Sequence, residues 1–399
     1  PQRWGGLIDL PAHVDEPAAT RLADALHGAH EDTQLAIRSS GVFARKLAHA
    51  GDNPEAAEWT PSGTVLITGG TGALGASVAR WLAGRGARHL VLTSRRGRNG
   101  DGAARLAGEL TELGVDVTLA ACDVADRESL AAVIKDIPDH CPLTAVVHAA
   151  GVLDDGTIDT LTPQRLHAVL HAKKQGAINA HELTAHLNLS AFVMFSSLAG
   201  TVGGVGQANY AAANAFLDAF AHVRRAMGLP ATSVAWGPWA GDGMAADPTI
   251  AERMRRNGVN PLSTDVAIEA LQGVLAAGDT QIAIADLTWS RFGAGLAASA
   301  HRHLIADLPE MVATRGRTVD TADPAERPDA FTDRLARMSD RDRDRAVRTL
   351  IRDHAAAVLG HSSGDRIQAN TPFKELGFDS LTAVEFRNSL SSVTRIALP

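Results

Sequence analysis

The stretch VLITGGTGALG, residues 65–75, decides the fold, because an apolar run passes directly into a glycine-rich turn. Residues 65–68 predict a buried strand, and residues 76–82 predict the helix after it. Glycines at such a turn let backbone amides approach a pyrophosphate. Strand and helix patterns then alternate over residues 62–290, which predicts an α/β fold with a doubly wound parallel sheet. The candidate cofactor contacts in the turn are Thr68, Gly69, Gly70, Thr71, Gly72, Ala73, Leu74 and Gly75.

The end of the second predicted strand, residues 89–93, indicates which cofactor binds. It runs into Ser94, Arg95 and Arg96 instead of the acidic residue that would bind a free ribose hydroxyl. Paired arginines suit a 2′-phosphate, so NADPH is the expected cofactor, with Arg95 favoured because it lies nearer the strand end. The alternative is an ordinary tight turn beside a solvated loop edge. Agreement between strand, turn and second strand end favours cofactor binding.

Two further strand ends complete the predicted cofactor site, since ligands in such sheets bind at the carboxyl ends of strands. Asp123 and Val124 would read an adenine edge, although Asp123 could equally be the N-cap of the following helix. The second group would lie beside the nicotinamide ribose. In it, His148 is better explained as structural or ribose-adjacent than as catalytic, and His171 is interpreted likewise. This group is His148, Ala149, Ala150 and Gly151.

The single tyrosine of the chain, Tyr210, lies thirteen residues after Ser197 and four before Asn214. A strand at residues 191–195 would deliver Ser197, and a helix would place Tyr210 and Asn214 on one face. A phenol so placed can protonate a carbonyl oxygen while a nicotinamide delivers hydride to the carbon. Each residue also has a plainer interpretation. Ser197 would satisfy hydrogen bonds at a strand end, and Tyr210 would pack in the core on an amphipathic helix. Lys173, a further candidate introduced below, would extend to solvent beside its neighbouring lysine.

Most short-chain reductases carry a lysine four residues after the tyrosine, where this chain has Asn214, and Lys173 is the candidate for the missing ammonium. That exchange resembles the ketoreductase domains of modular polyketide synthases. The resemblance implies a Rossmann-like fold of the short-chain dehydrogenase/reductase type and a β-ketoacyl thioester substrate, presented by an acyl carrier protein among neighbouring synthase domains. Ser197 and Tyr210 would bind the ketone, Lys173 would lower the pKa of the tyrosine, and Asn214 would orient the proton relay. The resemblance rests on residues 4–11, 68–75, 153–155, Ser197, 210–215 and 236–239.

The same resemblance extends to stereochemistry. Leu153, Asp154 and Asp155 match the motif of B-type reductases, which set a 3R (D) hydroxyl. Val202 stands where A-type enzymes have tryptophan, and Val205 where epimerising B-type enzymes have proline, which implies the non-epimerising B1 class. The alternative is that the two aspartates only solubilise a loop. Gln207 and Met244 are further candidate substrate contacts, the latter in residues 241–257, which suit either a mobile lid or a plain surface helix.

The expected domain organisation has four parts. Residues 1–60 resemble the C-terminal part of a truncated Rossmann-like structural subdomain, residues 61–309 form the NADPH-binding catalytic part, and residues 310–340 form a linker. Residues 341–399 resemble part of a helical acyl carrier domain, in which Ser380 would bear 4′-phosphopantetheine if the domain is complete. The alternative role of Ser380 is a helix N-cap. The start without methionine and the end inside a motif predict that the chain was cut from a longer polypeptide.

Composition limits the remaining function classes. A net charge of −7 argues against a nucleic-acid surface, and apolar runs are too short for a membrane span. Two cysteines, Cys122 and Cys141, suit a reducing cytoplasm, and the sixteen scattered histidines show no metal-ligand spacing, so no metal is expected. Two alternatives to the reductase remain: a catalytically silent scaffold, and a free-standing extended short-chain dehydrogenase or epimerase.

Overall fold

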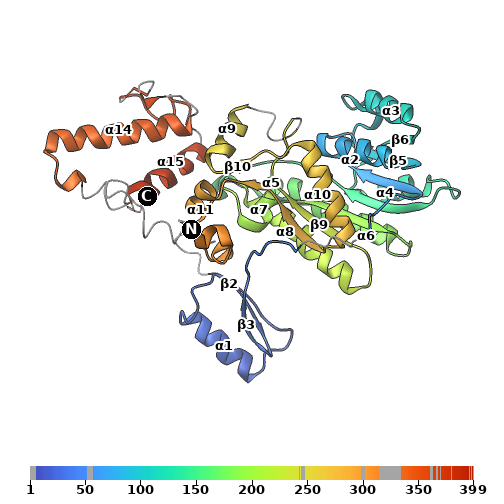
Figure 1. Ribbon diagram of the computed structural model, residues 1–399, viewed down its shortest axis with the longest axis horizontal. Helices are drawn as coiled ribbons and strands as arrows, with labels where there is room; N and C mark the ends of the chain where they lie inside the picture. Colours follow the sequence, from blue (N-terminus) through green and yellow to red (C-terminus); the bar gives the residue numbers. More distant parts are fainter. Residues whose placement is uncertain are drawn as a thin grey trace.

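The computed structural model describes residues 6–51, 57–241, 243, 248–297, 302–313, 334–359, 363–364, 367–368, 370–378, 380–394, 396 and 398. They form a seven-stranded sheet flanked by helices, a small three-stranded sheet near the N-terminus, and a helix pair near the C-terminus (Figure 1).

The central sheet is entirely parallel, with the strand order β11-β9-β8-β7-β4-β5-β6. Its order reverses between β4 and β7, which are neighbours although two strands separate them in sequence. A crevice for a ligand opens at the carboxyl ends of strands at such a reversal. The doubly wound Rossmann-like fold is therefore confirmed. The strands are β4 Thr64–Thr68, β5 His89–Ser94, β6 Asp116–Ala121, β7 Leu143–His148, β8 Ala191–Ser197, β9 Thr232–Trp236 and β11 Gln281–Ile284.

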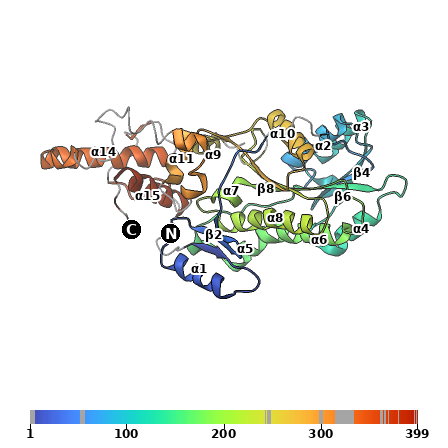
Figure 2. The same ribbon diagram turned by 60° about the horizontal axis from the view of Figure 1, so that its bottom comes forward.

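Helices cover both faces of this sheet (Figure 2). One face packs on α2 (Ala73–Gly84), α3 (Ala103–Glu112) and α10 (Thr264–Ala277), where Leu82, Leu106 and Leu271 are buried. The other face packs on helices that include α4, α6 and α8, where Leu130 and Leu217 are buried. Because neither face meets water, the central strands read as unbroken apolar runs instead of alternating ones. These helices are α4 Arg127–Lys135, α6 Gly176–Thr184 and α8 Ala208–Ala226.

Shorter elements surround the carboxyl ends of the strands. The helix α5 (Pro163–Leu170) continues through a π-helical turn, η3 (His171–Gln175), into α6 without a break. The helix α7 (Leu198–Val202) follows β8 directly. The other elements are η1 Gly97–Asn99, η2 Ile158–Thr160, α9 Pro248–Arg256, β10 Val259–Asn260, β12 Asp286–Leu287, α11 Trp289–Ala297 and η5 Arg302–Ile305.

The N-terminal part contains β1 (Leu7–Asp9), α1 (Glu16–Leu26), β2 (Gln34–Arg38) and β3 (Gly41–Ala44). β1 runs parallel to β2, and β3 runs antiparallel to it. The strand β3 ends at Ala44, and the Leu47 amide beyond it donates to the Leu304 carbonyl at 2.8 Å instead of pairing in the sheet. Trp4, which contributes to the family resemblance, lies outside the described residues.

The C-terminal part forms a small core between α14 (Asp340–Val358) and α15 (Ser380–Thr394). Phe373, Phe378 and Phe386 pack their rings together, with centroids 5.0–5.4 Å apart. The expected linker at residues 310–340 falls largely on residues 314–333, which lie outside the described residues. Met311 packs with Ile305 and Leu308, so these contacts lie on both sides of the expected boundary at residue 309.

Candidate active site

Three positions of the glycine-rich turn after β4 leave no room for a side chain. Gly69 has a φ of +68°, and a Cβ added there would lie 2.9 Å from the backbone of Ala150. A Cβ on Gly70 would lie 2.8 Å from the Ile67 carbonyl oxygen, and one on Gly75 only 2.4 Å from the Gly69 carbonyl oxygen. Gly72 is the N-cap of α2 and supplies no side-chain cap. The N-terminus of α2 is thus accessible at close range, which fits a phosphate group.

The end of β5 fits the adenosine half of NADPH. The Ser94 hydroxyl is buried and has no hydrogen-bond partner among the described residues. Arg95 and Arg96 are both exposed, and Arg96 pairs with Asp101 at 2.9 Å. Within the same described ranges, no acidic partner lies within ion-pair distance of Arg95. The Arg95 guanidinium is therefore the less engaged of the two, and its binding to a 2′-phosphate stays a prediction.

Asp123 does not cap the helix after it, so the alternative raised for this residue is wrong. Its Oδ1 accepts from the Ala125 amide at 3.0 Å in a local turn. The N-cap of α4 is Asp126, which accepts from the amides of Glu128 and Ser129. The Asp123 side chain is exposed at the sheet edge, whereas Val124 is buried beneath it.

The His148 ring is structural. It is fully buried, with Nδ1 2.7 Å from the Thr68 hydroxyl and Nε2 2.9 Å from the Lys173 carbonyl oxygen. A carbonyl only accepts, so Nε2 carries the hydrogen and Nδ1 accepts from Thr68. Burial lowers the pKa of His148 to about 4, which keeps the ring neutral. Both ring nitrogens are occupied, so the ring is not free to contact a cofactor, although Ala149 and Gly151 follow it at the crevice.

The π-helical turn η3 places Lys173 inside the site. The side chain is buried, and its Nζ donates to the Phe195 carbonyl at 2.8 Å while lying 5.6 Å from the centre of the Tyr210 ring. Gly151 leaves room for it, since a Cβ there would lie 3.0 Å from the lysine Cε. The alternative that Lys173 extends to solvent is therefore wrong. Burial lowers the pKa of Lys173 to about 8, and the negative charge of Asp218 partly opposes that shift.

Tyr210, Ser197 and Asn214 are buried together beside this lysine. Burial raises the pKa of Tyr210, and hydrogen bonds with the Ser197 and Asn214 side chains act in the opposite direction. Ser197 Oγ also accepts from the Ala199 amide at 3.2 Å, so its plainer role at a strand end coexists with the contact to tyrosine. Asn214 Nδ2 donates to the Tyr210 carbonyl at 2.8 Å, while its Oδ1 is buried without a partner in the described part of the chain.

Asp218 is a member of this polar cluster that the sequence reasoning missed. It is buried on α8, and its Oδ1 accepts from the Ser233 hydroxyl at 2.7 Å. Burial raises the pKa of Asp218, and its charge acts on Lys173. The signal was the spacing, because Tyr210, Asn214 and Asp218 follow one another at intervals of four on one helical face.

The loop after β7 carries the predicted stereochemical motif and borders the start of α8. Its two aspartates do not merely solubilise it: Asp154 binds Arg165 at 2.6 Å, and Asp155 Oδ2 accepts from Gln207 at 2.8 Å. Leu153 and Val205 are exposed, and Val202 is buried. Met244 lies outside the described residues.

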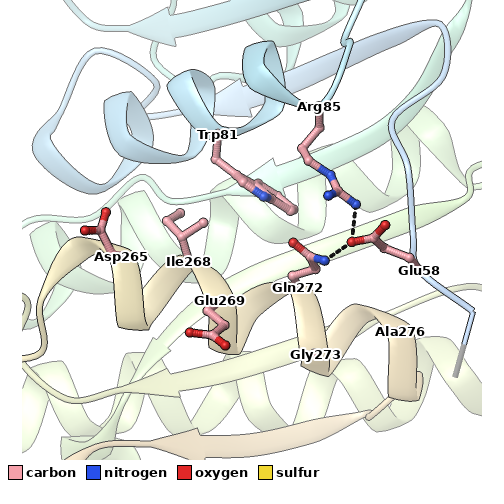
Figure 3. Close-up of a pocket in the computed structure, with 9 residues that line it drawn as sticks. All are labelled: Glu58, Trp81, Arg85, Asp265, Ile268, Glu269, Gln272, Gly273 and Ala276. Carbon is pink, nitrogen blue, oxygen red and sulfur yellow. Dashed lines mark hydrogen bonds and ion pairs between the residues drawn. The ribbon is translucent and has the colours of Figure 1, made fainter. Parts of the chain in front are cut away.

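A cavity of about 590 Å³ lies away from this chemistry, between α2 and α10 (Figure 3). Glu58 reaches into it, binding Arg85 at 2.5 Å and accepting from Gln272. None of the predicted site residues lines it. Its lining residues are Glu58, Trp81, Arg85, Asp265, Ile268, Glu269, Gln272, Gly273 and Ala276.

Two negative findings hold for the described ranges of the chain. In those ranges no group of three or more His, Cys, Asp or Glu side chains is arranged to hold a metal ion. Over the same ranges no helix is both long and apolar enough to cross a membrane.

Comparison with known proteins identifies the family. The KR domain family matches residues 63–241, and the phosphopantetheine attachment site family matches residues 349–399. Polyketide synthase GfsA of Streptomyces halstedii is 47% identical over 407 residues, covering 100% of this chain. The chain spans only 5% of GfsA, so it corresponds to a small section of that relative.

Solved structures agree. A structure described as an A1-type ketoreductase has 51% identity and a TM-score of 0.76, covering 78% of this chain and 66% of that one. The ketoreductase from the first module of phoslactomycin biosynthesis in Streptomyces sp. HK803 has 40% identity and a TM-score of 0.71, covering 76% of this chain and 71% of that one. The chain therefore belongs to the ketoreductases of modular polyketide synthases, which are NADPH-using oxidoreductases of the short-chain dehydrogenase/reductase type, and it also carries a phosphopantetheine attachment region.

Proposed function

We propose that this chain reduces a β-ketoacyl thioester, presented by an acyl carrier protein, to the β-hydroxyacyl thioester. One observation carries the proposal. Lys173 from η3, Ser197 from β8, and Tyr210 and Asn214 from α8 are buried together at the carboxyl ends of β7 and β8. A buried lysine beside a buried phenol is costly to assemble for packing alone.

The residue roles follow from donors and acceptors. Ser197 and Tyr210 each carry a hydroxyl that can donate to the ketone oxygen, and Tyr210 gives its proton to that oxygen as negative charge develops there. The bound nicotinamide supplies the hydride that reaches the ketone carbon. Asn214, with its buried Oδ1 unpartnered in the described structure, is suited to hold a relay group that returns a proton to Tyr210.

Lys173 acts by charge. An ammonium near the tyrosine ring favours the tyrosinate that forms when the proton leaves, which opposes the effect of burial on the pKa of Tyr210. The hydrogen bond from Nζ to the Phe195 carbonyl fixes the ammonium near the site. In the cofactor half, the turn at residues 68–75 would hold the pyrophosphate, Ser94 and Arg95 the 2′-phosphate, and Asp123 the adenine edge.

The proposed product has a 3R hydroxyl and an unchanged α-carbon. Support comes from Leu153, Asp154 and Asp155 at the mouth of the site, and from Val202 and Val205 in place of the tryptophan and proline of other classes. The description A1-type belongs to the related solved structure, and similarity of fold does not distinguish A-type from B-type reductases.

Ser380 is the proposed phosphopantetheine attachment residue, because α15 begins at it inside the matched region. The proposed partners are an acyl carrier protein and neighbouring synthase domains, and the proposed compartment is the cytoplasm. Both cysteines are free thiols, which suits a reducing compartment.

The decisive experiment is NADPH oxidation with a racemic 2-methyl-3-ketoacyl thioester, for the wild type and Tyr210→Phe, with products resolved by chiral chromatography. A 3R product whose formation needs Tyr210 supports the mechanism and the class. A 3S product would overturn the stereochemical part only. No NADPH oxidation by folded protein would favour the silent scaffold.

A further inference from the structure

Arg165, on α5, holds the loop after β7 through an unusual number of contacts. Its Nε and Nη2 both donate to Asp154 Oδ1, at 2.8 and 2.6 Å. Nη2 also donates to the Asp155 carbonyl at 2.6 Å, and Nη1 to the Thr160 carbonyl at 3.0 Å. One side chain therefore binds two residues of the irregular loop between Gly151 and η2, Asp154 and Asp155, and also the last residue of η2, Thr160.

These contacts require arginine. The acceptors lie in different directions around one planar fork, which a lysine ammonium on a flexible stem cannot match at the same time. The loop backbone has adapted to the fork, since a Cβ on Gly156 would lie 2.6 Å from Arg165 Nη1. The charges also respond to each other: Arg165 lowers the pKa of Asp154, and Asp154 raises the pKa of Arg165.

The opposite side of the loop is tied to the residues around the catalytic tyrosine. Asn209 Nδ2 donates to the Asp154 carbonyl at 2.8 Å, and Asn209 Oδ1 accepts from the Tyr210 amide at 2.9 Å. The Gly156 amide donates to the Gly206 carbonyl at 2.7 Å. The loop is thus held between Arg165 on one side and the start of α8 on the other, with the exposed Leu153 beside the crevice.

We propose that Arg165 is a positioning residue for stereochemistry: it fixes residues 153–156 against the start of α8 and so determines which face of the ketone meets the hydride. The inference rests on the proposed reduction, and it holds for either sense of the product. The choice between the two faces of the ketone is sensitive to the position of this loop, because a tenfold product ratio needs a difference of only about 1.4 kcal/mol between two transition states. A displacement of the substrate by about 1 Å is enough to change a reaction rate about a hundredfold.

The test uses the whole chain with the racemic thioester, and the readout is the ratio of stereoisomeric products for Arg165→Ala and Arg165→Lys. Product arises only from folded enzyme, so the ratio does not depend on how much of a variant folds. We expect Arg165→Ala to lower the ratio at least fivefold and Arg165→Lys to lie between it and the wild type. Arg80→Ala is the matched control, since Arg80 also places Nε and Nη2 on one carboxylate oxygen, that of Glu109. Its ratio should stay within twofold of the wild type.

The outcomes separate the inference from the function it rests on. If the wild type does not oxidise NADPH, the proposed function fails. If the wild type turns over and Arg165→Ala keeps its product ratio, only the positioning role fails. If Arg165→Ala forms no product, Arg165→Lys decides: a ratio equal to the wild type overturns the inference, because charge without the fork would then suffice, and a lowered ratio supports it.

Discussion

The proposed cofactor half and the proposed substrate half of the crevice are built in different ways. Around Gly69, Gly70 and Gly75 the site is backbone, and its shape follows from missing side chains. Around Lys173 and Tyr210 the site is a set of buried polar side chains held by specific hydrogen bonds. The first kind of site tolerates no added atom, whereas the second tolerates shape changes but loses its chemistry when one polar group is removed.

The largest expected effect is the loss of that chemistry. Tyr210→Phe removes the proton donor and keeps the ring, so kcat should fall by about 10²–10⁴-fold. NADPH affinity and thermal stability should stay close to the wild type, because the removed hydroxyl is not part of the cofactor half. Steady-state NADPH oxidation and a thermal melt check this. A kcat within tenfold of the wild type would contradict the assignment.

In the cofactor half the damaging change is the addition of a methyl group. Gly75→Ala brings a Cβ within 2.4 Å of the Gly69 carbonyl, so the turn must move. NADPH affinity should fall by about tenfold or more, or at least ~1.4 kcal/mol, measured by fluorescence titration.

Gly84→Ala is the matched control in the same helix, because nothing lies within 4 Å of its added Cβ. Its affinity should be unchanged, and its stability unchanged or higher by up to about 1 kcal/mol. Equal losses in both variants would mean that helix α2, and not the turn, is sensitive to alanine.

A smaller effect concerns pH. Lys173, with its pKa at about 8, is charged below that pH and loses the charge as pH rises through it. Because the charged form favours the tyrosinate, kcat/KM should decline severalfold from pH 7 to pH 9. Lys173→Met should have a lower kcat/KM without this decline. A flat wild-type profile, or the same decline in the variant, would contradict the role of the ammonium.

The smallest effect separates structure from catalysis at His148. Its folded-state pKa of about 4 lies below the usual 6.5, so between these pH values the unfolded chain binds a proton at His148 and the folded chain does not. Folding stability therefore falls as pH drops from 6.5 towards 4. His148→Gln keeps an amide donor for the Lys173 carbonyl but cannot be protonated, so denaturant unfolding should show a shallower acid slope. An unchanged slope would show that other groups dominate acid unfolding.

The comparison also explains what the sequence could and could not predict. The turn at residues 65–75 was predictable because the spacing of its glycines itself determines the path of the backbone. The pairing of Tyr210 with Asn214 was predictable from helix geometry. The burial of Lys173 was not, because it depends on a π-helical turn held by His148 from a distant strand. Arg165 was missed because its role exists only through contacts across a loop without periodicity. Asp123 was offered as a cap, but Asp126 is the residue whose carboxylate reaches the first amides of α4.

The π-helical turn has a consequence for anyone who recombines such enzymes. It amounts to one extra residue inside a continuous helix, and an α-helix turns about 100° per residue. Removing one residue there would rotate α5 relative to α6, carrying Arg165 away from its loop while α6 stays packed on the sheet. The turn therefore sets the rotation of α5, and of the loop that Arg165 binds, relative to the sheet, and a chimaera with a junction anywhere between residues 165 and 176 has to keep the same number of residues there.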